Sequence, residues 1–328
     1  MQVNKTEVAK KLIQEFTENG ISKYSKKKLA EIALKRYPDL FTSIDNARYC
    51  IRLITNSAGK ESRQKKLSNK VEWNGFQLPE PEKDDFTKVI VNQKRIAVLS
   101  DIHFPYYDRT ALNLAIKTAI EYEPDCIILN GDIIDCYHLS SFEKDPKKRS
   151  FKYELDMLKN FFIQLRELFP TQRIIYKIGN HEERYERYIL QRVPEFLDME
   201  LLSFGNVIEA KKFGIEIVTN KRVMKVGKLN ILHGHEMRSG IISPVNIARG
   251  FFMRTKSSTL GGHHHRTSEH LEQNLNGEII GCFSTGALCD LTPAYMPINS
   301  WNHGFALVEN FGNEFHVRNL KIINGKVV

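Results

Sequence analysis

Three short apolar segments in the middle of the chain predict strands that are buried in a sheet. They are Arg95–Leu99 (RIAVL), Cys126–Leu129 (CIIL) and Arg173–Ile178 (RIIYKI), and each is rich in β-branched residues. The segments between them, near Thr110–Glu123 and Phe151–Phe169, predict connecting helices. Because strands alternate with helices, we expect an α/β fold in which these strands run parallel.

The later part of the chain has the alternating pattern of strands. Phe213–Leu232 alternates through GIEIV, RVMKV and KLNIL, which predicts hairpins, and Pro244–Thr255 predicts a helix. The segments GEIIGCFSTGALC, GFALVEN and EFHVRNLKIING predict antiparallel strands. We expect these last strands to complete a second sheet.

The N-terminal part has the apolar period of short helices. It predicts a first helix over about Lys5–Glu18, which Gly20 stops. A second helix begins at a Ser25 cap and ends before Pro38, and a third starts near Ser43. The region therefore predicts a small three-helix domain.

Charge separates the regions of the chain. Residues 1–70 hold 16 Lys and Arg against 7 Asp and Glu, whereas the remainder holds 32 of each class. The formal net charge of +9 therefore lies in the first part of the chain. We expect a basic helical domain at 1–60, a polar, proline-containing linker at 61–94 and the α/β domain at 95–328.

Three short helices that end in a basic one resemble a helix-turn-helix domain, whose last helix enters a groove of the nucleic acid. Arg48 and Arg52 lie four residues apart on the solvent side of the predicted third helix. The resemblance predicts DNA or RNA as a partner that these two arginines contact. A protein-docking or solubilising domain is the alternative.

Five clusters of metal-binding residue types each lie behind an apolar run of the chain. They read SDIHF at 100–104, NGDIID at 130–135, GNHE at 179–182, LHGHE at 232–236 and GGHHHR at 261–266. One such cluster alone is typical of a turn or a helix cap, but clusters at the carboxyl ends of neighbouring strands converge on one crevice. They supply seven candidate ligands, namely Asp101, His103, Asp132, Asn180, His233, His263 and His265.

Seven ligands exceed what one tetrahedral site needs, which predicts two metal ions that share a bridging carboxylate. Carboxylate oxygens together with imidazole nitrogens suit manganese, iron, zinc, cobalt or nickel better than calcium or magnesium. We expect manganese first. Two divalent ions about 3.5–4 Å apart can activate a bridging hydroxide for in-line attack on phosphorus, so the clusters indicate a phosphoester hydrolase.

The order and spelling of the clusters resemble the calcineurin-like metallophosphoesterase family, whose pattern is DxH, GDxxD, GNH[ED], H and GHxH. The match covers about residues 95 to 325, and the run WNHGFALVE is similar to stand-alone phosphoesterases of bacteriophages and bacteria. The resemblance implies a four-layer αββα sandwich, preceded here by the three-helix domain. It also implies a first metal held by Asp101, His103 and His265, a second held by Asn180, His233 and His263, and a bridge at Asp132.

Two further residues take roles from this resemblance. His181 matches the family's general acid or transition-state donor, and Asp135 matches the carboxylate that orients this histidine. His264, between two predicted ligands, is expected to face away from the metals if GGHHHR is extended, because alternate residues of a strand face opposite sides.

One departure from the family pattern bears on the substrate. The protein serine/threonine phosphatases of the family have an arginine directly after GDxxD, where this chain has Cys136. A protein phosphatase is therefore disfavoured. Arg184 and Arg187 could grip phosphate instead, although pairing with glutamates on a solvated helix face is the alternative. His235 is a further candidate for contacting substrate oxygens.

Composition disfavours several other classes of protein. No segment approaches the roughly 18–20 apolar residues of a membrane span, and the N-terminus lacks a signal-peptide core. The five cysteines are an odd number without CxxC spacing, which favours a reducing compartment. We expect a cytoplasmic protein with no membrane partner.

The sequence thus predicts a dinuclear metal phosphoesterase that acts on a nucleic-acid or nucleotide phosphodiester, because its charge surplus could recruit polyanions. A phosphomonoesterase acting on a small metabolite or a protein is the first alternative. A nucleic-acid- or protein-binding module with a structural metal centre is the second, and the complete ligand set with His181 and Asp135 argues against it.

Overall fold

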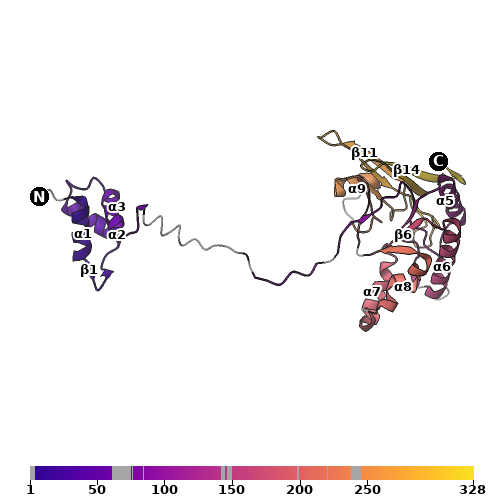
Figure 1. Cartoon of the computed structure of the whole chain (residues 1–328), viewed down its shortest axis with the longest axis horizontal. Coiled ribbons are helices and arrows are strands. Elements are labelled where there is room, and N and C mark those ends of the chain that lie inside the picture. The colour runs from indigo at the N-terminus through magenta and orange to yellow at the C-terminus, as the bar shows by residue number, and fades with distance from the viewer. Residues whose placement is uncertain are drawn as a thin grey trace. The chain divides into compact units, whose positions relative to one another are not determined.

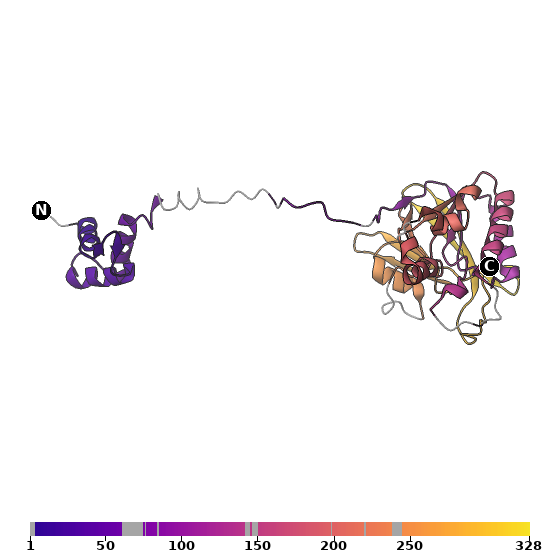
Figure 2. The same ribbon diagram turned by 90° about the horizontal axis from the view of Figure 1, so that it is seen from below.

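The computed structural model describes residues 4–60, 75, 77–83, 85–141, 145, 150–197, 199–219, 221–237 and 245–328. The chain divides into two compact units, Met1–Pro81 and Glu82–Val328, whose elements are drawn in Figures 1 and 2. Residues 61–74 of the predicted linker lie outside the described residues.

The N-terminal unit contains the three predicted helices, α1 (Lys5–Glu15), α2 (Lys26–Arg36) and α3 (Ile44–Ile54). A polar side chain caps each of them, because the oxygens of Asn4, Ser25 and Ser43 accept hydrogen bonds from backbone N–H groups of the first turns. The helices enclose a small core of Val8, Ala9, Leu12, Leu29, Ala30, Ala33, Phe41, Ala47 and Ile51.

The first helix is shorter than the sequence predicted. It ends at Glu15, and Thr17–Glu18 (β1) then pairs antiparallel with Ile21–Ser22 (β2). Asn19 and Gly20 both have left-handed backbone, with φ of 50° and 79°, as a two-residue type I′ hairpin turn requires. Gly20 therefore closes a hairpin instead of stopping a helix.

The third helix exposes the two predicted arginines. Arg48 and Arg52 are exposed on α3, and Tyr49 beside them is 54% exposed. The connection from α2 to α3 runs from Tyr37 to Ser43, which is longer than the three- to four-residue turn of a standard helix-turn-helix. The unit shares with that motif its three helices and its basic last helix.

The second unit is built on a seven-stranded sheet. Its order is β15 (Lys326–Val327), β14 (Phe315–Ile323), β13 (His303–Asn310), β4 (Arg95–Leu99), β5 (Cys126–Asn130), β6 (Arg173–Lys177) and β7 (Ile215–Val218). The strands β4 to β7 run parallel, as predicted for β4, β5 and β6, and β13 lies antiparallel to β4. Two predictions are wrong here: β7 pairs with β6 and not in a hairpin, and β13 and β14 extend this sheet and do not complete the second one.

A second sheet has six strands. Its order is β11 (Ser268–Gln273), β12 (Ile279–Ser284), β10 (Thr259–Gly261), β9 (Leu229–Ile231), β8 (Met224–Val226) and β3 (Val89–Ile90). The predicted hairpin is confirmed for β8 and β9. The strand β3 lies within the segment assigned to the linker, and it pairs with β8 because Val89 is buried between the sheets.

Alternate residues of β4 face two different cores, which places the sheets in layers. Ala97 and Leu99 pack with the helices α5 (Arg109–Tyr122) and α6 (Phe151–Leu168), while Ile96 and Val98 pack against the six-stranded sheet. The helix α9 (Ile247–Thr255) covers the other face of that sheet. The four-layer αββα sandwich is therefore confirmed, and α5 and α6 lie along one side of it in Figure 1.

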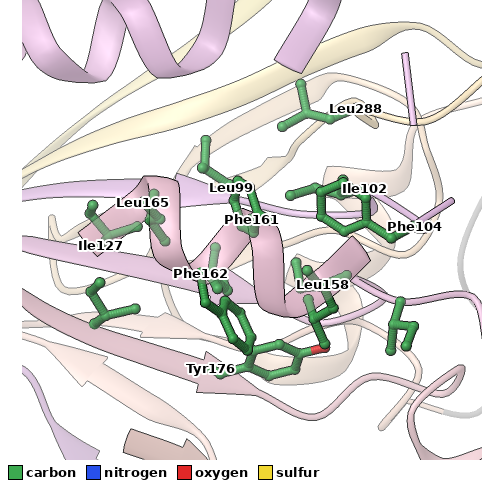
Figure 3. Close-up of a cluster of buried hydrophobic side chains, with 14 of the residues drawn as sticks. Leu99, Ile102, Phe104, Ile127, Leu158, Phe161, Phe162, Leu165, Tyr176 and Leu288 are labelled. Atoms are coloured by element: carbon green, nitrogen blue, oxygen red, sulfur yellow. The ribbon is translucent and has the colours of Figure 1, made fainter. Parts of the chain in front are cut away.

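The core under α6 fixes the position of the parallel strands. Phe162 and Leu165 of α6 pack over Ile127 and Tyr176, as Figure 3 shows. The rings of Phe162 and Tyr176 lie 6.1 Å apart in an edge-to-face arrangement. Truncating a buried Phe to Ala costs about 3–5 kcal/mol, so this contact stabilises the scaffold on which the strand ends rest.

The remaining helices are short and follow β6. They are α7 (Glu183–Arg192) and α8 (Phe204–Val207), with the 3₁₀ turns η2 (Pro194–Phe196), η3 (Glu200–Leu202) and η4 (Ala210–Phe213). A further 3₁₀ turn, η1 (Tyr137–Leu139), lies earlier, between β5 and α6. The predicted start of α9 at residue 244 lies outside the described residues. Among the described helices, none is both long and apolar enough to cross a membrane.

Candidate metal centre

The predicted ligands lie just beyond the carboxyl ends of adjacent strands. Asp101 and His103 follow β4, Asp132 follows β5, and Asn180 follows β6 in the seven-stranded sheet. In the six-stranded sheet, one ligand follows β9 and two follow β10, namely His233, His263 and His265. The two sheets therefore bring all five sequence clusters to one edge of the sandwich.

Five of the predicted ligands have left-handed backbone. The φ angles are 56° at Asp101, 54° at His103, 51° at Asp132, 68° at His263 and 53° at His265. Non-glycine residues adopt this conformation uncommonly, although Asn, Asp and His do so more readily than others. Such strain persists only where the surrounding structure holds it, and it gathers at functional sites.

The segment GGHHHR is not extended, so the strand alternation from which the orientation of His264 was predicted is absent. The strand β10 ends at Gly261, and His263 and His265 both reach the site from left-handed backbone. The ring of His264 lies 4.9 Å from that of His263, edge to face, and 5.9 Å from that of Phe251 on α9. Its part is to pack the loop against the outer helix.

One group of ligands lies around His103. The Nδ1 atom of this imidazole lies 3.1 Å from Asp135 Oδ1, which can only accept, so Nδ1 carries the proton and Nε2 presents a lone pair. That Nε2 lies 3.2 Å from Nε2 of His265, which is itself 3.2 Å from Asp101 Oδ1. Two imidazole nitrogens and a carboxylate thus converge on one point.

Sequence reasoning missed Cys289 in this group. Its thiol lies 3.9 Å from His265 Nδ1, and the ligand atoms of His103, His265 and Cys289 lie within 4.8 Å of one another. Cys289 follows β12 in a segment without a recognisable motif, so only the sheet order reveals it. Burial raises the pKa of this thiol, although His265 opposes the shift.

The second group of ligands lies around Asp132. The ligand atoms of Asp132, His233 and His263 lie within 4.8 Å of one another. The Nδ1 atom of His233 donates to the Asn130 carbonyl at 2.7 Å, which leaves Nε2 facing Asp132 Oδ2 at 3.2 Å. Asp132 also contacts the first group, since its Oδ2 lies 3.9 Å from His103 Nε2.

Among the seven predicted ligands, two buried polar atoms make no hydrogen bond. They are Oδ1 of Asn180 and Nε2 of His233, both predicted ligands of the second metal. A buried polar atom without a partner is costly, and a missing ion is one ordinary explanation. The lack of a partner at these two atoms is therefore evidence that the residues of this site fit a cation.

The charges of the site point the same way. Burial would raise the pKa of the Asp132 carboxyl, but His233 and His181 lower it well below its ordinary value. Burial lowers the pKa of His233, and Asp132 outweighs this effect and raises it to about 10. The buried carboxylate thus stays ionised and demands positive charge beside it, which a divalent cation supplies. The donor set fits two such ions, with Asp132 in contact with both groups.

His181 and Asp135 lie together, as the resemblance implied. Nδ1 of His181 lies 2.8 Å from the Asp135 carboxylate and 3.0 Å from its backbone oxygen. Burial would lower the pKa of His181, but Asp132 and Asp135 raise it above its ordinary value. The backbone N–H of His181 also donates to Asp132 Oδ1 at 2.9 Å, which ties the predicted acid to the predicted bridge.

Arg184 reaches the same corner from α7. Its guanidinium donates to the Asp135 carbonyl at 2.9 Å and lies 3.0 Å from His181 Nε2. Cys136, at the position where the protein phosphatases have arginine, is buried and presents no charge. Arg184 therefore supplies the cation that the GDxxD segment itself lacks.

The other two predicted substrate contacts differ from each other. Arg187 is half exposed, pairs loosely with Glu183 at 3.9 Å, and lines a pocket of about 340 Å³ with Arg184, Arg192 and Asn180. The side chain of His235 is only 7% exposed, and its Nε2 lies 3.0 Å from Glu183. The structure thus places Arg187 beside the centre, whereas His235 faces a carboxylate of α7.

The last residue of GNHE, Glu182, has a structural part that sequence reasoning missed. This carboxylate is buried and accepts the backbone N–H groups of Asp132, Ile133 and Gly179 at 2.8–3.0 Å. It also accepts the hydroxyl of Tyr176 at 2.7 Å. Glu182 thus fixes the loop after β5 to the loop after β6, and its place in the motif was the available clue.

Close backbone approach explains the glycine of the same motif. A Cβ at Gly179 would overlap the carboxylate of Asp132 and lie 2.5 Å from its backbone nitrogen. A larger residue would therefore displace the candidate bridging carboxylate. The sequence pattern Gly-Asn-His serves to bring two strand ends into contact.

The chain is similar to several known proteins. A family model described as calcineurin-like phosphoesterase matches residues 94–317. The Gene 54 protein of Mycobacterium phage L5 is 26% identical over 247 residues, which are 71% of this chain and 95% of that protein. The Gene 54 protein of Mycobacterium phage D29 is 23% identical over 249 residues, with the same coverage. Among solved structures, vacuolar protein sorting 29 from Cryptosporidium parvum aligns at 15% identity with a TM-score of 0.39, covering 73% of this chain and 96% of its own.

Proposed function

The chain belongs to the calcineurin-like phosphoesterase family and is a metal-dependent phosphoester hydrolase, and we propose that its substrate is a phosphodiester of a nucleic acid or nucleotide. Asp101, His103 and His265 would hold one divalent ion. Asn180, His233 and His263 would hold the other, and Asp132 would contact both. When bound, the two ions supply an activated water and neutralise charge on the phosphate oxygens.

In this proposal, His181 handles the proton of the leaving oxygen. Asp135 holds its Nδ1–H, so Nε2 is the atom that faces the reaction. Arg184 now lies beside that Nε2. A bound substrate phosphate would attract this guanidinium, and Nε2 would then be free to carry the proton that the departing alkoxide needs.

The observation that carries the substrate class is the cationic pocket beside Asn180. Arg184, Arg187 and Arg192 line it together with Ser140 and Ser141. Guanidinium groups bind phosphate with paired, charge-assisted hydrogen bonds. A monoester presents one phosphate, and that phosphate occupies the metal centre. A row of arginines next to it suits the neighbouring phosphate of a longer substrate.

The N-terminal unit supports the same substrate class. Its exposed arginines lie on one helix with an exposed tyrosine between them, and cationic and aromatic side chains together are suited to nucleic-acid backbones and bases. This unit would raise the local concentration of a polyanionic substrate. The relatives in two mycobacteriophages are consistent with an enzyme that a phage encodes.

A substrate panel tests the proposal. The metal-free protein is reconstituted with manganese, iron, zinc, cobalt or nickel and assayed on bis(p-nitrophenyl) phosphate, p-nitrophenyl phosphate and single- and double-stranded DNA and RNA. We expect kcat/KM to be higher for the diester than for the monoester, and we expect cleavage of at least one nucleic acid. A higher kcat/KM on the monoester with no cleavage of nucleic acid would move the phosphomonoesterase alternative ahead.

A pair of substitutions tests the cationic pocket itself. Arg192→Gln should raise KM for an oligonucleotide by several-fold and leave KM for bis(p-nitrophenyl) phosphate close to its starting value. Arg249→Gln, an exposed arginine of α9 outside this pocket, is the matched control. An equal change in KM for both substrates would show that the pocket does not distinguish a longer substrate.

A further inference from the structure

A second pocket opens beside the metal centre on the side of His103. It has a volume of about 180 Å³, and its lining includes His103, Asp135 and Cys289. Four aromatic side chains form its walls, namely Tyr106, Tyr137, Tyr295 and Trp301. Pockets for drug-sized ligands are larger, about 300–1,000 Å³, so this one has room for a single ring system.

The aromatic walls come in two pairs. The rings of Tyr106 and Tyr137 lie 6.4 Å apart, and those of Tyr295 and Trp301 also lie 6.4 Å apart. Trp301 packs edge to face on His265 at 4.2 Å. A ring seated between the two pairs would therefore lie next to the candidate ligands of the first metal.

The outer wall belongs to the connection between β12 and β13, and hydrogen bonds hold this connection in place. The backbone N–H of Asp290 donates to the Tyr106 carbonyl at 2.8 Å. The Asn299 side chain donates to the Leu291 carbonyl at 2.7 Å and accepts the N–H of Trp301 at 2.9 Å. The connection nevertheless leaves Tyr295 71% exposed at the mouth of the pocket. An aromatic ring held in water at the edge of a site is suited to stacking on a ligand.

The charge of the pocket decides which part of a substrate it suits. Asp135 and Asp290 contribute carboxylates to its lining, and these repel a phosphate. A flat, uncharged ring with N–H donors avoids that repulsion. It can stack on the aromatic side chains and donate a hydrogen bond to a carboxylate. Nucleobases have these properties, since each has a π-face and most present amino or imino donors.

We propose that this aromatic pocket, which we call the base pocket, seats the nucleobase that flanks the scissile phosphate. The proposal rests on the proposed function, because a nucleotide substrate must be bound for the pocket to act. The arginine pocket beside Asn180 then takes a neighbouring phosphate, and the base pocket takes the ring. The specificity for the cleaved bond would then depend on the neighbouring base as well as on the phosphate itself.

Two esters with one leaving group test the proposal. Thymidine 5′-(p-nitrophenyl phosphate) and methyl p-nitrophenyl phosphate both release p-nitrophenol, and only the first carries a base. We expect the manganese-loaded protein to prefer the thymidine ester in kcat/KM by about 5- to 150-fold, the range that stacking of one base accounts for. Tyr295→Ala should lower this ratio several-fold, and Tyr295→Phe, which keeps the ring, should restore most of it.

The matched control lies on the same connection. Ile298 is 93% exposed and does not line the pocket, so Ile298→Ala should keep the wild-type ratio. A ratio near one in the wild-type protein, or an equal loss on both esters in Tyr295→Ala, would overturn the base pocket. The first result would mean that the aryl leaving group occupies it, and the second that Tyr295 only supports the fold.

A binding measurement separates this inference from the proposed function. Calorimetry with thymidine 5′-monophosphate and with ribose 5-phosphate reports the contribution of the base without turnover. Tighter binding of the nucleotide, lost in Tyr295→Ala, supports the base pocket even if no phosphodiester is cleaved. Turnover of both esters without any dependence on the base keeps the proposed function and rejects the pocket. An oligothymidylate with one abasic residue distinguishes a nucleic-acid strand from a mononucleotide ester as the source of the base.

Discussion

The carboxylate of Asp135 lies 2.8 Å from Nδ1 of His181, and its Oδ1 atom also lies 3.1 Å from Nδ1 of His103. One carboxylate therefore orients the predicted proton donor and a predicted metal ligand at the same time. The sequence pattern assigned it only the first of these tasks. The geometry couples the acid to the metal group, and substitutions at the two residues should separate the two effects.

Removal of the imidazole in His181→Ala should spare metal binding, because His181 is outside the seven predicted ligands. We expect two metals per chain and a kcat lowered by about 10²–10⁴-fold on an alkyl leaving group. Activated aryl esters should lose less, since their leaving oxygen needs less protonation. Metal analysis together with kcat on both ester types is the measurement, and loss of metal would move His181 into the ligand shell.

Asp135→Asn should affect metal binding as well as turnover. The neutral amide oxygen accepts from both imidazoles more weakly than the charged carboxylate does, so the orientation of His103 weakens together with that of His181. Loss of such an outer partner typically lowers metal affinity by about 10–100-fold. A metal titration monitored by activity would show this shift. An unchanged affinity with lowered kcat would return Asp135 to a single role.

Asp132→Asn should remove most bound metal and nearly all turnover, because Asp132 contacts both ligand groups. Asparagine tolerates the left-handed backbone of this position, so the fold should survive the change. Metal content and circular dichroism of the purified variant are the measurements. Retention of two metals with near-native rate would contradict the dinuclear assignment.

Glu154 predicts a pH dependence of stability. It is buried on α6 with Oε2 making no hydrogen bond, and burial, followed by the charge of Asp135, raises its pKa from 4.5 to about 8. Between these two pH values the folded state keeps a proton that the unfolded state has lost, so this group makes stability fall as pH rises. The variant Glu154→Gln has no titrating carboxyl at this position, so its stability lacks this contribution to the pH dependence.

Urea unfolding at pH 5.5 and pH 8.5 measures this effect. The free energy of unfolding of the wild type minus that of Glu154→Gln should decrease between the two values. Glu167→Gln, at an exposed position of the same helix, is the control and should show no such change. A difference that increases with pH would mean that the carboxyl is ionised and paired in the folded state.

The N-terminal unit is tested by charge reversal on two different helices. Arg48→Glu with Arg52→Glu should weaken DNA or RNA binding and flatten its dependence on salt, because fewer counterions are released. Lys10→Glu with Lys11→Glu on the exposed face of α1 changes the net charge equally. If both pairs reduce affinity equally, the unit attracts polyanions through charge alone, without a recognition helix.

The sequence was sufficient for the parts of the fold that depend on local chemistry. Apolar runs such as Cys126–Leu129 and helix caps such as Ser25 act within a few residues, so their elements lie where the pattern predicted them. The strand β3 was missed because Val89 and Ile90 are too short a segment to show a period. Their pairing with β8 is a long-range contact.

The candidate site shows the same division. The motifs identified the seven predicted ligands and Asp135 from the sequence. The structure has these residues at one edge, because each lies shortly after a strand. Cys289 and Arg192 lie there only because of sheet order and the direction of α7. The left-handed backbone at His263 and His265 was not predictable from an alternating pattern, since the backbone turns after β10.

Left-handed backbone at five ligand positions also restricts how this centre could be redesigned. Asp, Asn and His are the non-glycine residues that accept this conformation most readily, and they include both the oxygen and the nitrogen donors of ordinary metal sites. Exchanges among these three residues should alter metal preference at little cost to the loops. Glutamate or cysteine at the same positions would strain the left-handed backbone, and this cost would reduce their binding of any metal. The range of accessible metals therefore depends on φ as much as on ligand chemistry.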